Sequence, residues 1–148
     1  MNKNQVDILL VEDDYEEAEL TIRSLKRNNI VNNIIHFDDG PEALDYIFCQ
    51  GKYSVEENRK NPKLILLDLN LPKINGLEIL KRIKQNDATC TIPVVMLTSS
   101  KEEKDIIESY KLGVNSYIVK PVVFDSFSKA IQDLKMYWMV LNQGLPEQ

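Results

Sequence analysis

The chain has 148 residues, 43% of them hydrophobic and 28% charged, which suits one globular domain with a core of its own. Its net charge of −5 argues against broad non-specific binding to nucleic acid, and we expect no direct DNA binding. No apolar run approaches the roughly 20 residues of a membrane span. Residues 1–6 carry no signal-peptide core, so we expect a cytoplasmic protein without membrane contact.

The first half of the chain predicts two strand–helix units. Residues 7–11, apolar after Asp7, predict a strand, and a helix is expected to follow over about 15–28, with Asp14 as its cap. A second, short strand is predicted at 33–37. The helix after it carries apolar residues on one face and is expected to close at Gly51.

The second half predicts three further strand–helix units after a long connection. Residues 51–63 are polar and irregular, so we expect a surface loop that is open to a partner contact. Strands are predicted at residues 64–67, 94–97 and 116–119, and helices after Gly76, over about 101–112 and over about 123–141.

Five strands that alternate with five helices predict an α/β fold. We expect a doubly wound, five-stranded parallel sheet of order 2-1-3-4-5, with the helices in two layers. One domain is expected over residues 7–141, between short tails at 1–6 and 142–148. In this order the first strand lies beside the third, at the switch point where open α/β sheets bind their ligands.

Polar side chains follow four of the five predicted strands. They are Glu12 and Asp13 after the first, Asp68 and Asn70 after the third, Thr98 after the fourth and Lys120 after the fifth. Each alone has an ordinary explanation as a helix cap or a solvated charge, but together they converge on one edge of the sheet. Neighbouring carboxylates repel each other and need a cation, and hard oxygen ligands suit Mg²⁺.

Zinc does not fit this pattern, because His36 is the only histidine and lies in the middle of a short predicted strand. We expect His36 to be a packing or surface residue rather than a catalytic base. Cys49 and Cys90 have no CxxC spacing, and we expect buried or half-buried free thiols in a reducing compartment.

The motifs, taken as a set, resemble the receiver domain of two-component response regulators. The resemblance covers about residues 7–140 and is carried by Glu12-Asp13-Asp14, Asp68-Leu-Asn-Leu-Pro…Gly76, Thr98-Ser99 and Tyr117…Lys120-Pro121. Within that family the chain is most similar to the small single-domain regulators that partner phytochromes. The finer likeness is carried by the loop after Gly51, the phrases at 66–72 and 92–98, and Tyr137-Trp138.

The resemblance implies that Asp68 is the phosphoacceptor and takes a phosphoryl group from a histidine of a sensor kinase. It further implies that Asp13 binds Mg²⁺ directly, that Glu12 binds it through water, and that the backbone carbonyl of Asn70 completes the protein ligands with Asp68. Such a protein is not an ordinary enzyme, but a phosphoprotein that assists its own phosphorylation and dephosphorylation.

The remaining motif residues take roles around the phosphoryl group in the same family pattern. Lys120 is implied to pair with the phosphoryl oxygens, and Thr98 to donate a hydrogen bond to one of them. Tyr117 is implied to be the aromatic switch that rotates inward afterwards. The Lys120–Pro121 bond is expected to be a cis peptide that directs the lysine into the site.

The end of the last predicted helix is apolar on every side over residues 136–141, which is more than one buried face can use. The helix end folds back on its own domain or forms a symmetric homodimer or docking surface, and we favour the second. The candidate interface residues are Phe127, Tyr137 and Trp138. Because no helix-turn-helix or second catalytic domain is recognisable, the expected output is a protein contact, downstream of a phytochrome-type kinase.

Three alternatives stay open. An Mg²⁺-dependent phosphatase with an aspartyl nucleophile would place an Asp-x-Asp pattern after the first strand, where this chain has Glu12-Asp13-Asp14. A flavodoxin-like FMN binder needs a phosphate-binding loop there, and the acidic triplet would repel the phosphate. The third alternative is a receiver that acts as an unphosphorylated adaptor.

Overall fold

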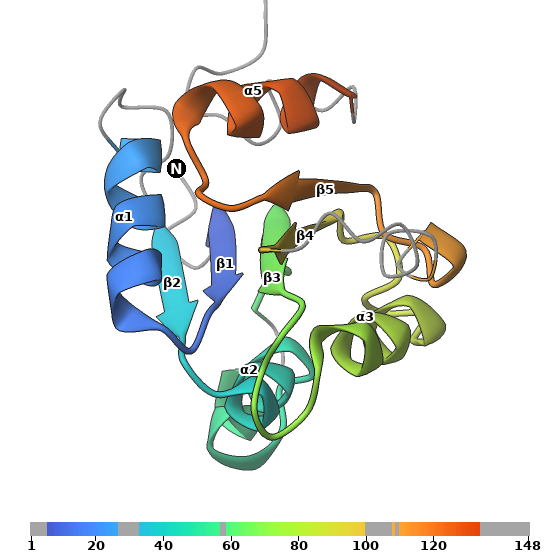
Figure 1. Cartoon of the computed structure of the whole chain (residues 1–148). Coiled ribbons are helices and arrows are strands. Elements are labelled where there is room, and N and C mark those ends of the chain that lie inside the picture. Colours follow the sequence, from blue (N-terminus) through green and yellow to red (C-terminus); the bar gives the residue numbers. More distant parts are fainter. Residues whose placement is uncertain (1–5, 27–32, 57–58, 100–107, 109, 134–148) are drawn as a thin grey trace, which may run out of the picture.

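Five parallel strands form the centre of the molecule. The computed structural model describes residues 6–26, 33–56, 59–99, 108 and 110–133. The strands are β1 (Ile8–Val11), β2 (Ile34–Phe37), β3 (Leu64–Asp68), β4 (Val94–Thr98) and β5 (Ser116–Val119). They pair in the order β2-β1-β3-β4-β5, every pair parallel (Figure 1), which confirms the predicted sheet.

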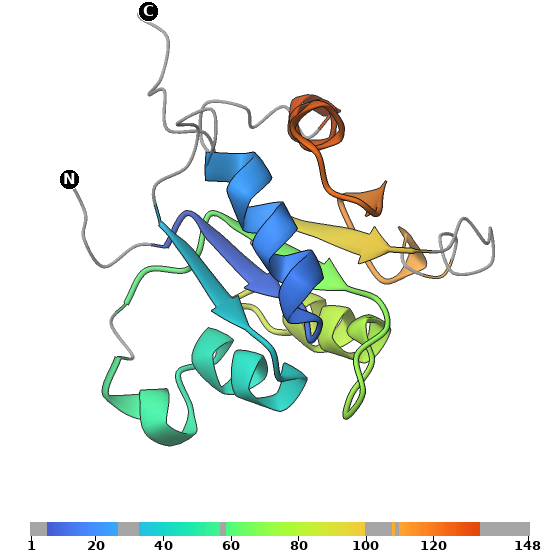
Figure 2. The ribbon, with the colours of Figure 1, turned by 60° about the vertical axis from the view of Figure 1, so that its left-hand side comes forward.

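Helices cover both faces of this sheet (Figures 1 and 2). On one face lie α1 (Tyr15–Lys26) and α5 (Phe124–Asp133), and on the other α2 (Gly40–Ile47) and α3 (Gly76–Gln85). Most of the fourth predicted helix, and the part of the last one beyond residue 133, lie outside the described residues. None of the helices within the described ranges is long and apolar enough to span a membrane.

The core is divided into two clusters, because successive strand residues point to opposite faces of the sheet. In β1, Ile8 and Leu10 pack in the cluster under α1 and α5, whereas Leu9 and Val11 pack in the cluster under α2 and α3. All four side chains are fully buried. A strand covered on both faces is apolar throughout, which is why the apolar run at residues 8–11 is continuous rather than alternating.

Phe127 of α5 belongs to the core and not to an interface. Its side chain is 0% exposed and packs in the cluster under α1 and α5. The expectation that Phe127 contributes to a dimer surface is therefore wrong. Helical periodicity identified the apolar stripe of this helix, but the sheet covers the part of the stripe that contains Phe127. Tyr137 and Trp138 lie outside the described residues.

The connection over residues 51–63 begins with a short helix where we expected an irregular loop, and it is irregular over residues 59–63. α2 ends at Ile47, and Gly51, with a φ of +57°, begins a short 3-10 helix, η1 (Gly51–Glu56). The ring of Tyr53 stands edge-on to Tyr46, with 5.1 Å between ring centroids, and its hydroxyl donates to Glu42 at 2.8 Å. One aromatic anchor therefore fixes a segment that is otherwise polar apart from the exposed Val55.

Side-chain caps fix where three helices begin. The carboxylate of Asp14 accepts hydrogen bonds from the N–H groups of Glu16 and Glu17, which confirms the predicted cap of α1. Asp39 caps α2 and Asn75 caps α3 in the same manner. Each cap lies in the loop that follows the carboxyl end of β1, β2 or β3, so these loops are held at both ends.

Candidate functional site

The hydrogen-bond ladder of the sheet continues past the strands at the carboxyl edge. The N–H groups of Glu12, Leu69 and Lys120 each donate to a carbonyl of a neighbouring strand at 2.8–3.0 Å. Asp68 is itself the last residue of β3 and pairs with β4. The sheet, and not a free loop, therefore positions the backbone at Glu12, Asp68 and Lys120.

Three acidic side chains converge at this edge. Glu12, Asp13 and Asp68 each offer a carboxylate oxygen, and these oxygens all lie within 4.8 Å of one another. Glu12 is 1% exposed and Asp68 is 3% exposed, whereas Asp13 is open to solvent. Because carboxylates this close repel each other, and because oxygen is the ligand that hard divalent cations prefer, these residues fit a divalent metal ion.

The ammonium of Lys120 lies against the same cluster. Its Nζ atom is 2.6 Å from Glu12 Oε1, 2.8 Å from Glu17 Oε2 and 3.2 Å from Asp68 Oδ2. A lysine ammonium has three hydrogen-bond donors, so one donor is available for each carboxylate. The peptide bond between Lys120 and Pro121 is cis.

Burial and charge shift the pKa values of this cluster. Burial raises the pKa of Glu12 to about 7, with a further contribution from the neighbouring Asp68 carboxylate and an opposing one from Lys120. Burial alone would lower the pKa of Lys120, but its hydrogen bonds to Glu12 and Glu17 and the charge of Asp68 raise it. The lysine is therefore held as an ammonium, and Glu12 takes up a proton near neutrality when no cation is bound.

The loop after β3 is pressed against the strand that carries Asp68. The N–H of Gly76 donates to the Leu69 carbonyl at 2.9 Å, and a Cβ atom at Gly76 would lie 2.3 Å from the backbone oxygen of Asp68. Only glycine permits this approach. The N–H of Asn70 lies 3.3 Å from Asp68 Oδ1 and orients the carboxylate from the loop side.

Thr98 and Tyr117 differ in their distance from the charged edge. Thr98 is the last residue of β4, is 3% exposed, and pairs in register with Val119, the residue before Lys120. Tyr117 lies inside β5, is half-buried, and meets Tyr110 edge-on at 6.2 Å between ring centroids. The sheet thus brings Thr98 to the edge that holds the charges, while Tyr117 packs farther back along its strand.

His36 and the two cysteines lie outside the charged cluster. The Nε2 atom of His36 is 2.7 Å from the backbone carbonyl of Glu12, and the ring is half-buried in β2. This contact braces the end of β1 and matches the expected packing role. Cys49 and Cys90 are half-buried and form no disulfide in the part of the chain that the structure describes, as expected.

Glu17 was not singled out by the sequence, because it resembles any acidic residue in the first turn of a helix. Its contact with Lys120 joins residues 103 positions apart. A usable signal is the helical spacing of Glu17 with Thr21, which is buried, and with Asp14, the cap. That spacing places Glu17 on the border of the helix face that turns toward the sheet.

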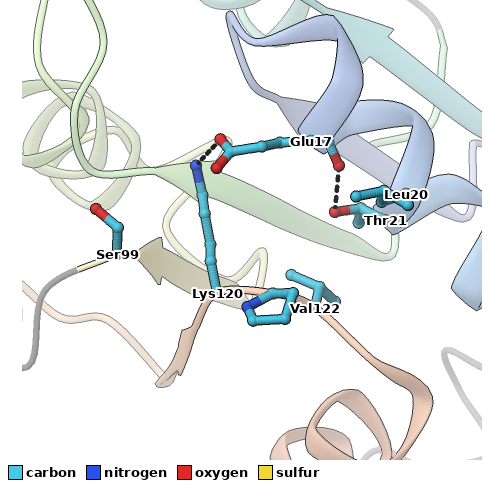
Figure 3. A pocket seen from close by; sticks show the side chains of 7 residues that line it. Glu17, Leu20, Thr21, Ser99, Lys120 and Val122 are labelled. Carbon is cyan, nitrogen blue, oxygen red and sulfur yellow. Dashed lines mark hydrogen bonds and ion pairs between the residues drawn. The ribbon is translucent and has the colours of Figure 1, made fainter.

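A cavity of about 240 Å³ opens beside the Lys120 side chain. Figure 3 shows Lys120 extending between Ser99 on one side and the α1 residues on the other, with its nitrogen directed at Glu17. The walls combine charged, hydroxyl and apolar groups from α1, the end of β4 and the turn after β5: Glu17, Leu20, Thr21, Ser99, Lys120, Pro121 and Val122.

A doubly wound sheet with an acidic cluster after β1 and β3, and a lysine after β5 in contact with it, is the arrangement of a receiver domain. The family model described as "Response regulator receiver domain" matches residues 8–132. The chain belongs to this family.

Individual relatives show where in the family the chain falls. Response regulator Rcp1 of Synechocystis sp. is 43% identical over 132 residues, which cover 89% of this chain and 88% of Rcp1. The structure of the bacteriophytochrome response regulator AtBRR is 49% identical, covers 92% of this chain and 96% of its own, and gives a TM-score of 0.81. The Mn(2+)-bound form of Rcp1 is 42% identical, with coverages of 95% and 98% and a TM-score of 0.73. The chain is thus similar to small phytochrome-associated response regulators.

Proposed function

We propose that this protein accepts a phosphoryl group on Asp68 from a histidine of a sensor kinase, in a transfer that requires Mg²⁺. The observation that carries the proposal is the meeting of three carboxylates within 4.8 Å, with the ammonium of Lys120 3.2 Å from Asp68. The likeness to Rcp1, whose structure is described in an Mn(2+)-bound form, supports a divalent cation at this cluster.

In the proposed transfer, a carboxylate oxygen of Asp68 attacks the phosphorus of the phosphohistidine. A phosphorus–oxygen bond forms while the phosphorus–nitrogen bond to the donor breaks, and the product is an acyl phosphate on Asp68. Such transfers depend on positioning and charge neutralisation more than on covalent assistance. Asn70 N–H and the β3 backbone orient the acceptor, and Lys120 offers positive charge to the phosphoryl oxygens.

A bound Mg²⁺ supplies further positive charge beside the phosphoryl oxygens. Its proposed protein ligands are Asp13 and Asp68 directly, Glu12 through water, and the backbone carbonyl of Asn70. Thr98 is proposed to donate a hydrogen bond to the acyl phosphate, and Tyr117 to turn inward afterwards. Structures with and without a phosphoryl mimic test the last step, and unmoved Thr98 and Tyr117 side chains would refute it.

The proposed setting is the cytoplasm, as one receiver domain over residues 7–141 that signals by protein contact. A phytochrome-type kinase is the proposed donor, which the 49% identity to AtBRR supports. Homodimerisation through Tyr137 and Trp138 is a proposal from the sequence. We expect Trp138→Glu to keep the fold and lower the assembly state, and an unchanged sedimentation coefficient would remove the idea.

Intact mass spectrometry tests the transfer directly. We expect the wild type to gain the mass of one phosphoryl group from acetyl phosphate with Mg²⁺, and to gain none with EDTA or as Asp68→Asn. An unmodified wild type would favour the adaptor alternative. Steady turnover of a small phosphate ester that survives Asp68→Asn would favour the phosphatase alternative instead.

A further inference from the structure

The three carboxylates that contact Lys120 differ in whether they belong to the acidic cluster. Glu12 and Asp68 are members of the acidic cluster that fits a divalent cation, whereas Glu17 is not. A cation at that cluster and the ammonium of Lys120 therefore compete for the same two carboxylates. Both are positive, so cation binding is favoured when the ammonium has another anion to contact.

Glu17 is fixed in a position to be that anion. Its N–H donates to the Asp14 carboxylate at 3.1 Å, and its carbonyl accepts from the buried Thr21 hydroxyl at 2.9 Å. The backbone is thus held on both sides while the side chain, 44% exposed, reaches across to Lys120. Figure 3 shows the contact of the Glu17 carboxylate with Lys120 and that of its carbonyl with Thr21.

We propose that Glu17 is a positioning residue that holds the Lys120 ammonium when a divalent cation takes up Glu12 and Asp68. The inference rests on the proposed cation site, but not on phosphoryl transfer. When a cation is bound, Glu17 gives the ammonium an anion to contact in place of Glu12 and Asp68. This lowers the free-energy cost of cation binding and keeps the ammonium within the site. It also competes with an incoming phosphoryl group for the same ammonium. The contact of Lys120 with the group on Asp68 is therefore weaker than it would be without Glu17.

The neighbouring Glu16 provides a matched control. It lies in the same turn of α1, is exposed, and carries the same charge, but it does not contact Lys120. Glu16→Gln and Glu17→Gln therefore change the net charge equally and differ in the contact that they remove. Because one half-exposed ion pair is affected, we expect Glu17→Gln to weaken cation binding by about two- to fivefold.

The experiment measures Mg²⁺ and Mn²⁺ affinity by calorimetry for the wild type, Glu16→Gln and Glu17→Gln, and for the same changes in a Lys120→Gln background. We expect Glu17→Gln to weaken binding more than Glu16→Gln in the wild type, and the two to become equal without Lys120. Equal effects in the wild type, or an excess that persists in Lys120→Gln, would overturn the inference.

The outcomes separate this inference from the proposed function. A wild type that binds neither cation overturns both, whereas a wild type that binds them without the Glu17 excess overturns the inference alone. Absence of phosphorylation, with the expected affinities intact, would refute only the proposed transfer. If the Lys120→Gln proteins do not fold, equal effects of Glu17→Gln and Glu16→Gln in the wild type still overturn the inference.

Discussion

Gly76→Ala is the change for which the structure gives the clearest magnitude. The added Cβ would lie 2.3 Å from the Asp68 carbonyl oxygen and 2.9 Å from the Leu69 Cα atom, both of them backbone atoms. To reach an ordinary contact of 3.4 Å, the start of α3 and the end of β3 must separate by about 1.1 Å. No side-chain rotation relieves this clash, so Asp68, the proposed acceptor, must move.

Overpacking of this kind costs about 1–3 kcal/mol of folding stability. At roughly 4 °C per kcal/mol for a domain of this size, the Tm falls by about 4–12 °C. The effect on phosphorylation is larger, because a displacement near 1 Å of a reacting group costs about 100-fold in rate. Gly76→Ala is therefore expected to fold and to accept phosphoryl groups very slowly.

Gly40→Ala is the matched control, since Gly40 is also a buried first residue of a helix. Its added Cβ would lie 2.7 Å from Ile74 Cγ2 and 3.1 Å from Ile79 Cδ1, which are side-chain atoms and not the backbone of the strand that carries Asp68. We expect a smaller loss of stability and a wild-type phosphorylation rate. The assays are thermal unfolding and the initial rate of mass gain from acetyl phosphate. A Gly76→Ala protein that matches Gly40→Ala in both assays would refute the reasoning.

Three further predictions follow from single contacts. Burial raises the pKa of Glu12 to about 7 from an ordinary 4.5, so its carboxyl stabilises the cation-free fold below pH 4.5, and this stabilisation is lost as pH rises through 7. In EDTA, we expect the wild type to lose stability relative to Glu12→Gln between these two pH values. Parallel curves of stability against pH would contradict this. Asp39→Ala removes the cap of α2 and the 2.7 Å ion pair with Lys73, so urea unfolding should show a loss of about 1 kcal/mol that Asp39→Asn, which keeps the cap, largely avoids. Lys84 Nζ donates to the Cys90 and Ile92 carbonyls at 3.2 and 2.7 Å, so Lys84→Met should cost about 1–3 kcal/mol of stability in the same assay. Lys81→Met, at an exposed position of α3, is the control, and an equal loss there would count against this prediction.

The sheet could be predicted because its information is local. β1, β3 and β4 are apolar runs that end at a polar group, and the alternation with helices leaves few arrangements. The cap at Asp14 and the charged edge at Glu12, Asp13 and Asp68 follow from the same pattern. Gly76 was part of the family motif, but its reason, the approach to the Asp68 carbonyl, is visible only in three dimensions.

The features that were not predicted from the sequence share one physical cause. Each of them depends on a contact with a residue elsewhere in the chain. Helical spacing assigned Phe127 to an apolar stripe, yet which neighbour covers a stripe is a tertiary property. η1 is polar apart from Tyr53 and Val55, and the aromatic contacts of Tyr53 fix it. Helical spacing places Glu17 near the face of α1 that turns toward the sheet, but its partner is identified only by the position of Lys120.

The central claim, that Asp68 is the acceptor at a cation-dependent site, is tested most directly by mapping the modified residue. The protein is treated with acetyl phosphate and Mg²⁺, reduced with borohydride, which converts an aspartyl phosphate to homoserine, and sequenced as peptides by mass spectrometry. We expect homoserine at position 68 alone, and only when Mg²⁺ is present. Modification at Asp13, or at Asp68 to the same extent in EDTA, would contradict the account.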